Sequence, residues 1–300
     1  MKNLIYLLCI AILLFVPIFH AAGQNSAEQK NEKQLRLMLI GAHPDDAEGF
    51  GGLAALYAKH GHKVQFVSMT NGDKGHQTMG GAQLARTRYE ECQCVGRVIG
   101  AEYIVMNTPD GELEPSLENR LDLIRIIRRF NPDLIITHAP DGYHPDHRYT
   151  TVLVHDATYM VMVPNLATDA PAMKYNPVLL YGGGSDPDVV IGIDEVAEQK
   201  VDMYHCHKSQ MYEWLPWIGG YLDKVPEGDA ERREWIKNSR TRGWENNANR
   251  HRDKLIEIYG KEAGQKIRYA ESYTASGYGG RYNDDKLYYY FPFMKEYQDK

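Results

Sequence analysis

The feature that most constrains the fold of this chain is a regular alternation of short apolar runs with longer amphipathic stretches over its first two thirds. The short runs have the length and β-branched content of strands, and the stretches between them carry apolar residues at helical spacing. Strands that alternate with helices in this way form a parallel sheet covered by helices on both faces. We therefore expect an α/β fold with a mostly parallel sheet and helices on both of its faces.

The expected elements follow one another closely along the chain. Strands are expected over 35–41, 63–70, 102–106, 133–137, 178–181 and 189–193, and helices over 47–60, 82–99, 116–130, 148–163, 194–207 and 229–259. Ser116 is the expected N-cap of its helix, and Gly61 and Gly100 are expected to end theirs. The last part of the chain is rich in tyrosine, and we expect it to be a helical extension.

The N-terminus has the pattern of a secretory signal peptide. Lys2 precedes an uncharged apolar run over 4–19, and small residues follow at 21–23. At about 16 residues the run is short for a membrane span, which needs about 20; an uncleaved anchor is the alternative. We expect a signal peptide over 1–23, a linker over 24–34 and export to the periplasm or the extracellular space.

The rest of the chain is expected to be one large domain, with its main part over 35–210 and an extension over 211–300 packed on it. The formal net charge is −6 for the whole chain and becomes −7 when Lys2 leaves with the signal. This acidic excess is spread along the chain, so it gives no electrostatic reason to bind nucleic acid or an anionic membrane. We expect neither partner after signal cleavage, and the oligomeric state stays open.

Three cysteines remain after the signal: Cys92, Cys94 and Cys206. Cys92 and Cys94 are two residues apart on an expected helix and point to different sides of it. An odd number of cysteines with this spacing is not typical of a disulfide framework. We therefore expect buried or tolerated thiols.

Two clusters of histidine and aspartate follow expected strands. The segment 43–46 (HPDD) comes directly after the first strand, and the segment 144–147 (HPDH) follows the strand that ends at Thr137. In an open parallel sheet, ligands bind beyond the carboxyl ends of the strands, so the two segments can converge. Either segment alone is explained by turn formation and helix capping, but two at equivalent strand ends favour a functional site.

The residue types in these clusters are those of a catalytic zinc site, which uses three protein ligands and leaves one position for water. His43, Asp46 and His147 would supply two imidazoles and a carboxylate, a set that also suits other divalent transition metals. Asp45 lies next to a ligand and is free to take a proton from water. His144 would face it across the substrate, as an imidazolium that stabilises the oxyanion or protonates the leaving amine.

Taken together, the motifs resemble the PIG-L/LmbE family of zinc-dependent N-acetylglucosaminyl deacetylases. The specific pair is AHPDD at 42–46 with HPDH at 144–147, and weaker pieces in the same order are TNGD at 70–73, RYEE at 88–91 and HKSQ at 207–210. The resemblance covers about residues 35–210 and implies a Rossmann-like fold and a zinc ion. The commoner motif is AHPDDE; here Ala47 follows Asp46, a variant that keeps the ligand positions.

The resemblance also implies roles for single residues. His43, Asp46 and His147 match the metal ligands, Asp45 matches the general base, and His144 matches the residue that assists the tetrahedral intermediate.

Three further residues match substrate-binding positions of the family. Arg88 matches a basic residue that contacts substrate, and Asp110 falls where some members bind sugar hydroxyls. Some members place a mobile tyrosine near the second motif to bind the oxyanion, and Tyr143 is the residue here that would correspond to it.

The expected reaction is therefore metal-dependent hydrolysis of an N-acetylated amino sugar or glycan, of N-acetylglucosamine type, to acetate and a free amine. Two alternatives stay open: an amidase that acts on another N-acyl or thiol-sugar conjugate, and a non-catalytic glycan-binding protein with a vestigial site. A dinucleotide-binding oxidoreductase is excluded, because no G-x-G-x-x-G follows the first strand. The aromatic segment 211–217 is expected to be core, with a flap formed by Trp217 and the glycines at 219–220 as the alternative.

Overall fold

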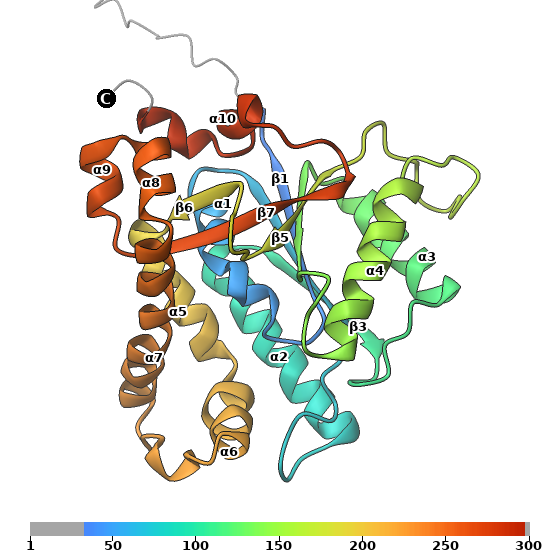
Figure 1. Cartoon of the computed structure of the whole chain (residues 1–300). Coiled ribbons are helices and arrows are strands. Elements are labelled where there is room, and N and C mark those ends of the chain that lie inside the picture. The colour runs from blue at the N-terminus through green and yellow to red at the C-terminus, as the bar shows by residue number, and fades with distance from the viewer. Residues whose placement is uncertain (1–32, 298–300) are drawn as a thin grey trace, which may run out of the picture. The chain divides into compact units, whose positions relative to one another are not determined.

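The computed structural model describes residues 33–297; the expected signal peptide and almost all of the expected linker lie outside this range. A seven-stranded sheet forms the centre of the described domain (Figure 1). Its strands are β1 Arg36–Gly41, β2 Lys63–Thr70, β3 Glu102–Thr108, β4 Leu134–Thr137, β5 Val178–Gly182, β6 Val189–Gly192 and β7 Ala270–Gly279. Their order across the sheet is β3-β2-β1-β4-β5-β7-β6.

The sheet is mostly parallel, which confirms the expected fold class. The neighbours from β3 to β5 are all parallel, whereas β7 runs antiparallel to both β5 and β6. The C-terminal part is helical, as expected, and it also contributes a strand that was not expected, β7, which crosses the middle of the view in Figure 1. Its sequence is AESYTASGYG. Small and polar residues give this segment little strand propensity of its own, so its pairing with β5 and β6 decides its structure.

Helices cover both faces of the sheet. They are α1 Gly51–Lys59, α2 Gly81–Ile99, α3 Leu117–Phe130, α4 Pro145–Met160, α5 Ala197–Cys206, α6 Leu215–Ile218, α7 Asp229–Arg250, α8 Arg252–Tyr259, α9 Lys261–Lys266 and α10 Leu287–Tyr290. Helices α3 and α4 pack on one face, and α1, α2 and α5 pack on the other (Figure 1). Within the described residues, no helix is both long enough and apolar enough to cross a membrane.

The side chains of strand β1 show why helices must cover both faces of the sheet. Leu37 and Leu39 point into one apolar core and Met38 and Ile40 into the other, and all four side chains are fully buried. Successive side chains of a strand point to opposite faces, so a central parallel strand reads as a continuous apolar run.

The helix ends follow local capping chemistry. Ser116 accepts a hydrogen bond from the Asn119 amide at 3.2 Å, as an N-cap does, and Gly100 ends α2 with a φ of 70°. Helix α4 begins three residues earlier than expected, because Pro145 occupies its first turn and His144 caps it. A break at His251 divides the single helix expected over 229–259 into α7 and α8.

Helices α2 and α5 are joined covalently. Cys94 and Cys206 form a disulfide with their Cα atoms 5.7 Å apart, so the expectation of free thiols is wrong for this pair. Cys92 is buried and free, as expected. Because Cys92 and Cys94 point to different sides of α2, one faces the core and the other reaches the end of α5.

Candidate metal centre and active site

The carboxyl ends of β1 and β4 lie side by side, since residues 37–39 pair in parallel with residues 134–136. The first histidine–aspartate segment follows β1, and the second forms the start of α4 after β4. Strand β1 pairs with β2 on one side and β4 on the other, which makes this the point where the strand order reverses. Ligands bind at such a point in open α/β sheets.

Three side chains converge at this point. His43 Nδ1 lies 3.2 Å from Asp46 Oδ2, and His147 Nε2 lies 3.3 Å from His43 Nδ1 and 3.4 Å from Asp46 Oδ2. Ligand atoms held at ~2.1 Å from one ion in a tetrahedron are roughly 3.4 Å apart. The three atoms therefore have the spacing and the chemistry of a divalent-metal site such as zinc.

The protonation states of these groups also suit a cation. Burial lowers the pKa of His147 to about 4, against the charge of Asp46, so its ring is neutral. Burial raises the pKa of Asp46, but His138 and His43 outweigh it and hold that pKa well below its usual range. Burial lowers the pKa of His43, but the nearby carboxylates outweigh this effect and raise the pKa to about 12, with the largest contribution from Asp110. A cation would replace the proton of His43.

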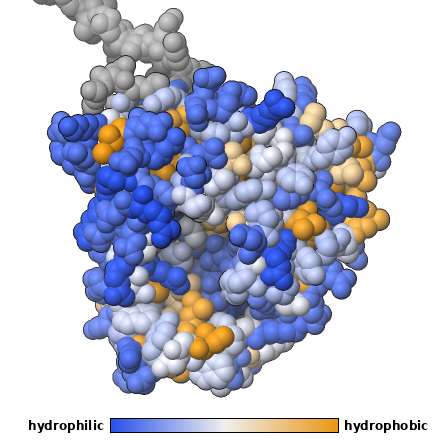
Figure 2. Space-filling model, in the orientation of Figure 1, coloured by the Kyte–Doolittle hydropathy of each residue, from blue (hydrophilic) through white to orange (hydrophobic). Residues whose placement is uncertain are grey.

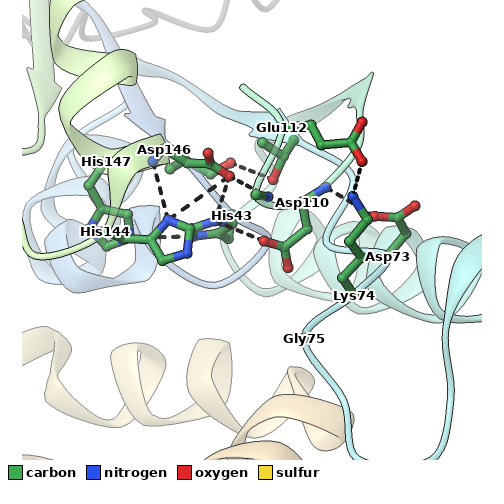
Figure 3. Close-up of polar contacts among 12 residues, drawn as sticks. His43, Asp73, Lys74, Gly75, Asp110, Glu112, His144, Asp146 and His147 are labelled. Atoms are coloured by element: carbon green, nitrogen blue, oxygen red, sulfur yellow. Dashed lines mark hydrogen bonds and ion pairs between the residues drawn. The ribbon is translucent and has the colours of Figure 1, made fainter. Parts of the chain in front are cut away.

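Two carboxylates hold the far side of the His43 ring. His43 Nε2 lies 3.2 Å from Asp146 Oδ2 and 3.3 Å from Asp110 Oδ1 (Figure 3). Asp146 Oδ2 also accepts the Gly111 amide hydrogen at 2.7 Å. Such partners fix the orientation of a metal-binding histidine. No role was predicted for Asp146, although it lies inside the HPDH segment.

His138 is a second residue of the site that was not predicted from the sequence. Its ring stacks on that of His147 with centroids 4.0 Å apart. Its Nε2 accepts the Ala42 amide hydrogen at 3.0 Å and lies 3.4 Å from Asp46 Oδ2. It is the first residue after β4, and this place at the sheet edge was the signal available in the sequence.

A second group of donors, His43 with Asp110 and His144, also comes together. In it, His144 Nδ1 already accepts the Asp146 amide hydrogen at 3.2 Å, as the N-cap of α4. The compact spacing around Asp46 favours the first group for the metal. Asp110 and His144 are then free to meet a substrate.

Asp45 has a strained backbone, with a φ of 126°. This is a region that residues other than glycine rarely adopt, and such strain clusters at functional sites. Its position is held by Asp46, which accepts the His43 amide hydrogen at 2.7 Å. Burial first, and then the charge of Asp46, raise the pKa of Asp45 to about 7 against the pull of His207 and Arg88. Asp45 is therefore placed to gain or lose a proton near neutral pH.

A cavity of about 410 Å³ opens beside the three converging side chains. Of the predicted site residues, those that line it are His43, Asp45, Arg88, Asp110, Tyr143 and His144. Asp46 and His147 complete the metal group at its edge. The structure thus brings all eight predicted site residues together.

Arg88 and Tyr143 differ in how firmly they are held. Arg88 is 2% exposed and donates through Nη2 to the Gly75 carbonyl at 2.7 Å, while its Nε has no partner among the described residues. Tyr143 is 85% exposed, with its ring 5.0 Å from that of His147. Arg88 is therefore a fixed donor, and the Tyr143 side chain has room to move.

Two of the weaker motifs, at 88–91 and 207–210, meet in a buried network with Glu48. His207 Nε2 lies 2.7 Å from Glu48 Oε1, and both side chains are fully buried. Glu91 accepts hydrogen bonds from the Ser209 amide at 2.6 Å and from its hydroxyl at 2.8 Å. The charge of His207 lowers the pKa of Asp45, so this network acts on the active site through the electric field.

The aromatic segment after α5 divides into two parts. Met211 and Tyr212 belong to the core, as expected. Trp214 lines the cavity, and Trp217 is 49% exposed, so the core expectation is wrong for these two. A π-helical turn over Gln210–Trp214 comes directly before α6; turns of this kind are frequent at functional sites.

The chain is similar to a known family and to named proteins. Residues 38–158 match the family model PIG-L, described as GlcNAc-PI de-N-acetylase. The "Probable N-acetyl-alpha-D-glucosaminyl L-malate deacetylase 2" of Bacillus cereus is 26% identical over an alignment of 218 residues that covers 67% of this chain and 94% of that protein. The mycothiol S-conjugate amidase of Streptomyces coelicolor is 29% identical over an alignment of 181 residues that covers 51% of this chain and 59% of that protein.

Solved structures share the fold. The N,N′-diacetylchitobiose deacetylase of Pyrococcus horikoshii superposes with a TM-score of 0.61 at 23% identity, over 80% of this chain and 83% of that one. The 4-carboxy-2-hydroxymuconate hydratase of Pseudomonas putida has a TM-score of 0.65 at 18% identity, over 83% and 99%. One fold therefore carries different chemistries, and the function has to be argued from the site.

Proposed function

We propose that this chain is a metal-dependent hydrolase that deacetylates an amino sugar of the N-acetylglucosamine type, since residues 38–158 match the PIG-L family model. The observation that carries the proposal is the convergence of His43, Asp46 and His147, whose donor atoms lie 3.2–3.4 Å apart. The Bacillus and Streptomyces relatives, named as a deacetylase and an amidase, support hydrolysis of an amide.

His43, Asp46 and His147 would hold the metal, with zinc as the first candidate. When bound, the metal supplies a Lewis acid that polarises the acetamide carbonyl and makes water more acidic. The side chains of Asp110 and Asp146 keep the His43 ring turned so that Nδ1 faces Asp46.

Asp45 and His144 have different roles in the reaction. Asp45 takes a proton from water as its oxygen attacks the carbonyl carbon. His144, whose Nδ1 is occupied by the Asp146 amide, offers Nε2 to the substrate. Its Nε2–H holds the developing oxyanion, and the proton that Asp45 took from water passes to the amine as the C–N bond breaks, which leaves acetate and a free amino sugar.

Arg88, Asp110 and Tyr143 would bind the substrate. The free Nε of Arg88 needs an acceptor, which a sugar hydroxyl provides. Asp110 Oδ2 accepts from a second hydroxyl, since Oδ1 faces His43. The exposed Tyr143 hydroxyl can swing towards the carbonyl oxygen.

The test is amine release from N-acetylglucosamine derivatives and from a thiol-sugar conjugate, with the zinc-loaded protein. Asp45→Asn should keep the metal and lower kcat by about 10²–10⁴-fold, the usual contribution of a general base. The exposed Asp253→Asn on α8 is the matched control and should change neither. Near-normal turnover by Asp45→Asn would refute the base assignment. Metal-loaded protein that releases no amine from any substrate would refute the function.

We also propose that the chain is exported. The pattern of residues 1–23 supports this, and so does the Cys94–Cys206 disulfide, because disulfides persist in oxidising compartments. Mass spectrometry of the protein from its source should find a mature N-terminus near residue 24, and an intact Met1 on protein from the cytosol would contradict export.

A further inference from the structure

Part of the cavity wall is formed by aromatic and aliphatic side chains that are exposed to solvent. Trp214 and Ile218 line the cavity next to Gly75 and Asp110. Trp217 stacks on Trp214, with ring centroids 5.4 Å apart and planes inclined by 19°. Ile218 is 63% exposed and Trp217 about half exposed. Figure 2 shows hydrophobic residues gathered at the lower edge of the molecule, where Figure 1 places α6. Exposed apolar surface at the mouth of a cavity marks a binding surface.

This aromatic wall lies within reach of the metal centre. A side chain at Gly75 would place its first carbon 3.2 Å from Asp110 Oδ2 and 3.6 Å from Trp214 Nε1. The other oxygen of Asp110 lies 3.3 Å from His43 Nε2. Only the Asp110 carboxylate and Gly75 therefore lie between His43 and the Trp214 indole. Because residue 75 has no side chain, the space between the metal centre and the indole stays open to a ligand.

The wall is held in place by a tie between two segments. His76 Nε2 lies 2.8 Å from Glu213 Oε2, so the loop that carries Gly75 is bound to the turn that carries Trp214. The other ring nitrogen of His76 accepts the amide hydrogens of Thr78 and Met79 at 3.2 and 3.1 Å. This fixes the tautomer of His76, whose side chain is buried. A preformed wall costs a ligand little ordering entropy.

We propose that Trp214 and Trp217 form a subsite for a second sugar ring, so that the substrate is an acetamido sugar linked to a neighbouring sugar. The proposal rests on the proposed function. The C–H face of a pyranose packs on an indole, and its hydroxyls meet polar groups at the edge. A cavity of about 410 Å³ lies in the range of roughly 300–1,000 Å³ that holds drug-sized ligands, which leaves room beyond one ring.

Polar groups beside the wall favour a sugar over an alkyl chain. Gln210 and Lys74 line the same cavity. The buried Gln210 Oε1 has no hydrogen-bond partner within the described part of the chain. A hydroxyl group would satisfy this oxygen, whereas an alkyl chain would leave it unpaired and desolvated.

The experiment compares kcat/KM of the zinc-loaded protein for N-acetylglucosamine, its octyl glycoside and N,N′-diacetylchitobiose. The disaccharide should be preferred over the monosaccharide by about tenfold or more, the effect of one good aromatic contact. Trp214→Ala and Trp217→Ala should each remove most of that preference, and Trp214→Phe should keep part of it. Tyr159→Ala on α4, equally aromatic and 69% exposed but outside the cavity lining, is the control and should change nothing.

Calorimetric titration of Asp45→Asn with the same sugars reads binding without turnover, and should show tighter binding of the disaccharide that Trp217→Ala weakens. Equal kcat/KM for the one-ring and two-ring sugars in the wild type overturns the subsite. A preference for the octyl glycoside over the disaccharide also overturns it. If no sugar is deacetylated, the proposed function fails, and titration of the wild type still decides the subsite, since equal affinities for both sugars overturn it.

Discussion

Two clusters in this domain each combine nitrogen-bearing side chains with a carboxylate, but they serve different purposes. At the first, His43, Asp46 and His147 point their donor atoms at one another beside an open cavity. At the second, Lys200 and Glu271 form a buried ion pair between α5 and β7. The clusters differ in whether the acceptor atoms already have hydrogen-bond donors within the protein.

The second cluster is closed on itself. Glu271 accepts the Gly52 and Leu53 amide hydrogens at 2.8 Å each, the Tyr273 hydroxyl at 2.5 Å, and the Lys200 ammonium. Lys200 also donates to the Gly49 carbonyl at 2.8 Å. Every oxygen of Glu271 has a donor, so the cluster needs no ligand and serves the fold. In the metal cluster two nitrogens and one oxygen face one another, and only a proton or a cation can reconcile them.

The largest effect that separates the two clusters is expected for His147→Ala. This change removes one of three metal ligands, so metal content should fall and kcat/KM should drop by at least about a thousandfold. The fold should survive, because His147 borders a cavity. Metal analysis and amine release measure the loss, with the exposed His60→Ala as control. A His147→Ala protein with one metal per chain and normal turnover would show that this cluster does not bind the metal that the reaction needs.

The converse change is Lys200→Met. It leaves the Glu271 carboxylate buried without its cation, which costs about 3–5 kcal/mol of unfolding free energy. Turnover per folded molecule should stay close to that of the wild type. Urea denaturation measures the change. Lys266→Met, in an exposed pair with Glu262, is the control and should cost less than about 1 kcal/mol. Equal costs for the two variants would show that the closed cluster does not stabilise the fold.

A smaller effect tests the support of the metal cluster. Asp146→Asn keeps the shape of the side chain but weakens its hold on the His43 ring, and metal affinity should fall by about 10–100-fold. Competition with a chelator measures this. Asp156→Asn lies on the same helix, pairs with Arg120 and serves as control. Unchanged affinity in Asp146→Asn would mean that Asp110 alone orients the ring.

The smallest effect concerns His207, which is fully buried in a network with Glu48, as Glu271 is with Lys200, but which acts on Asp45. Burial lowers the pKa of His207, but Glu48, Asp45 and Glu91 outweigh it and raise that pKa above its ordinary value. The folded state therefore holds a proton that the unfolded state releases above about pH 6.5. The stabilisation is complete below that pH and is lost as the pH rises through the folded pKa.

Thermal denaturation from pH 6 to 9 measures this contribution. The Tm advantage of the wild type over His207→Gln should shrink as the pH rises, by about 2–4 °C for each kcal/mol lost. Parallel Tm profiles for the two proteins would contradict a charged His207.

The metal cluster could be predicted from the sequence, whereas the Lys200–Glu271 cluster could not. His43 to Asp46 and His144 to His147 are contiguous motifs at the ends of apolar strands, so parallel pairing alone predicts their meeting. Lys200 and Glu271 lie 71 residues apart, and nothing near either marks its partner. Strand β7, which carries Glu271, was missed for the same reason. The Cys94–Cys206 bond, across 112 residues, was also beyond local patterns, as was the exposure of Trp217.

The disulfide has a consequence for how this protein can be handled. It closes a covalent ring that runs from α2 to the end of α5 and includes the exposed segment between α4 and β5, where Tyr175 lies. A protease that cuts this segment opens the ring without releasing a fragment. Nicked and intact molecules then have the same mass on a gel run without reductant, apart from one added water, and separate into two pieces only after reduction. Purity judged under oxidising conditions would therefore count both as one species.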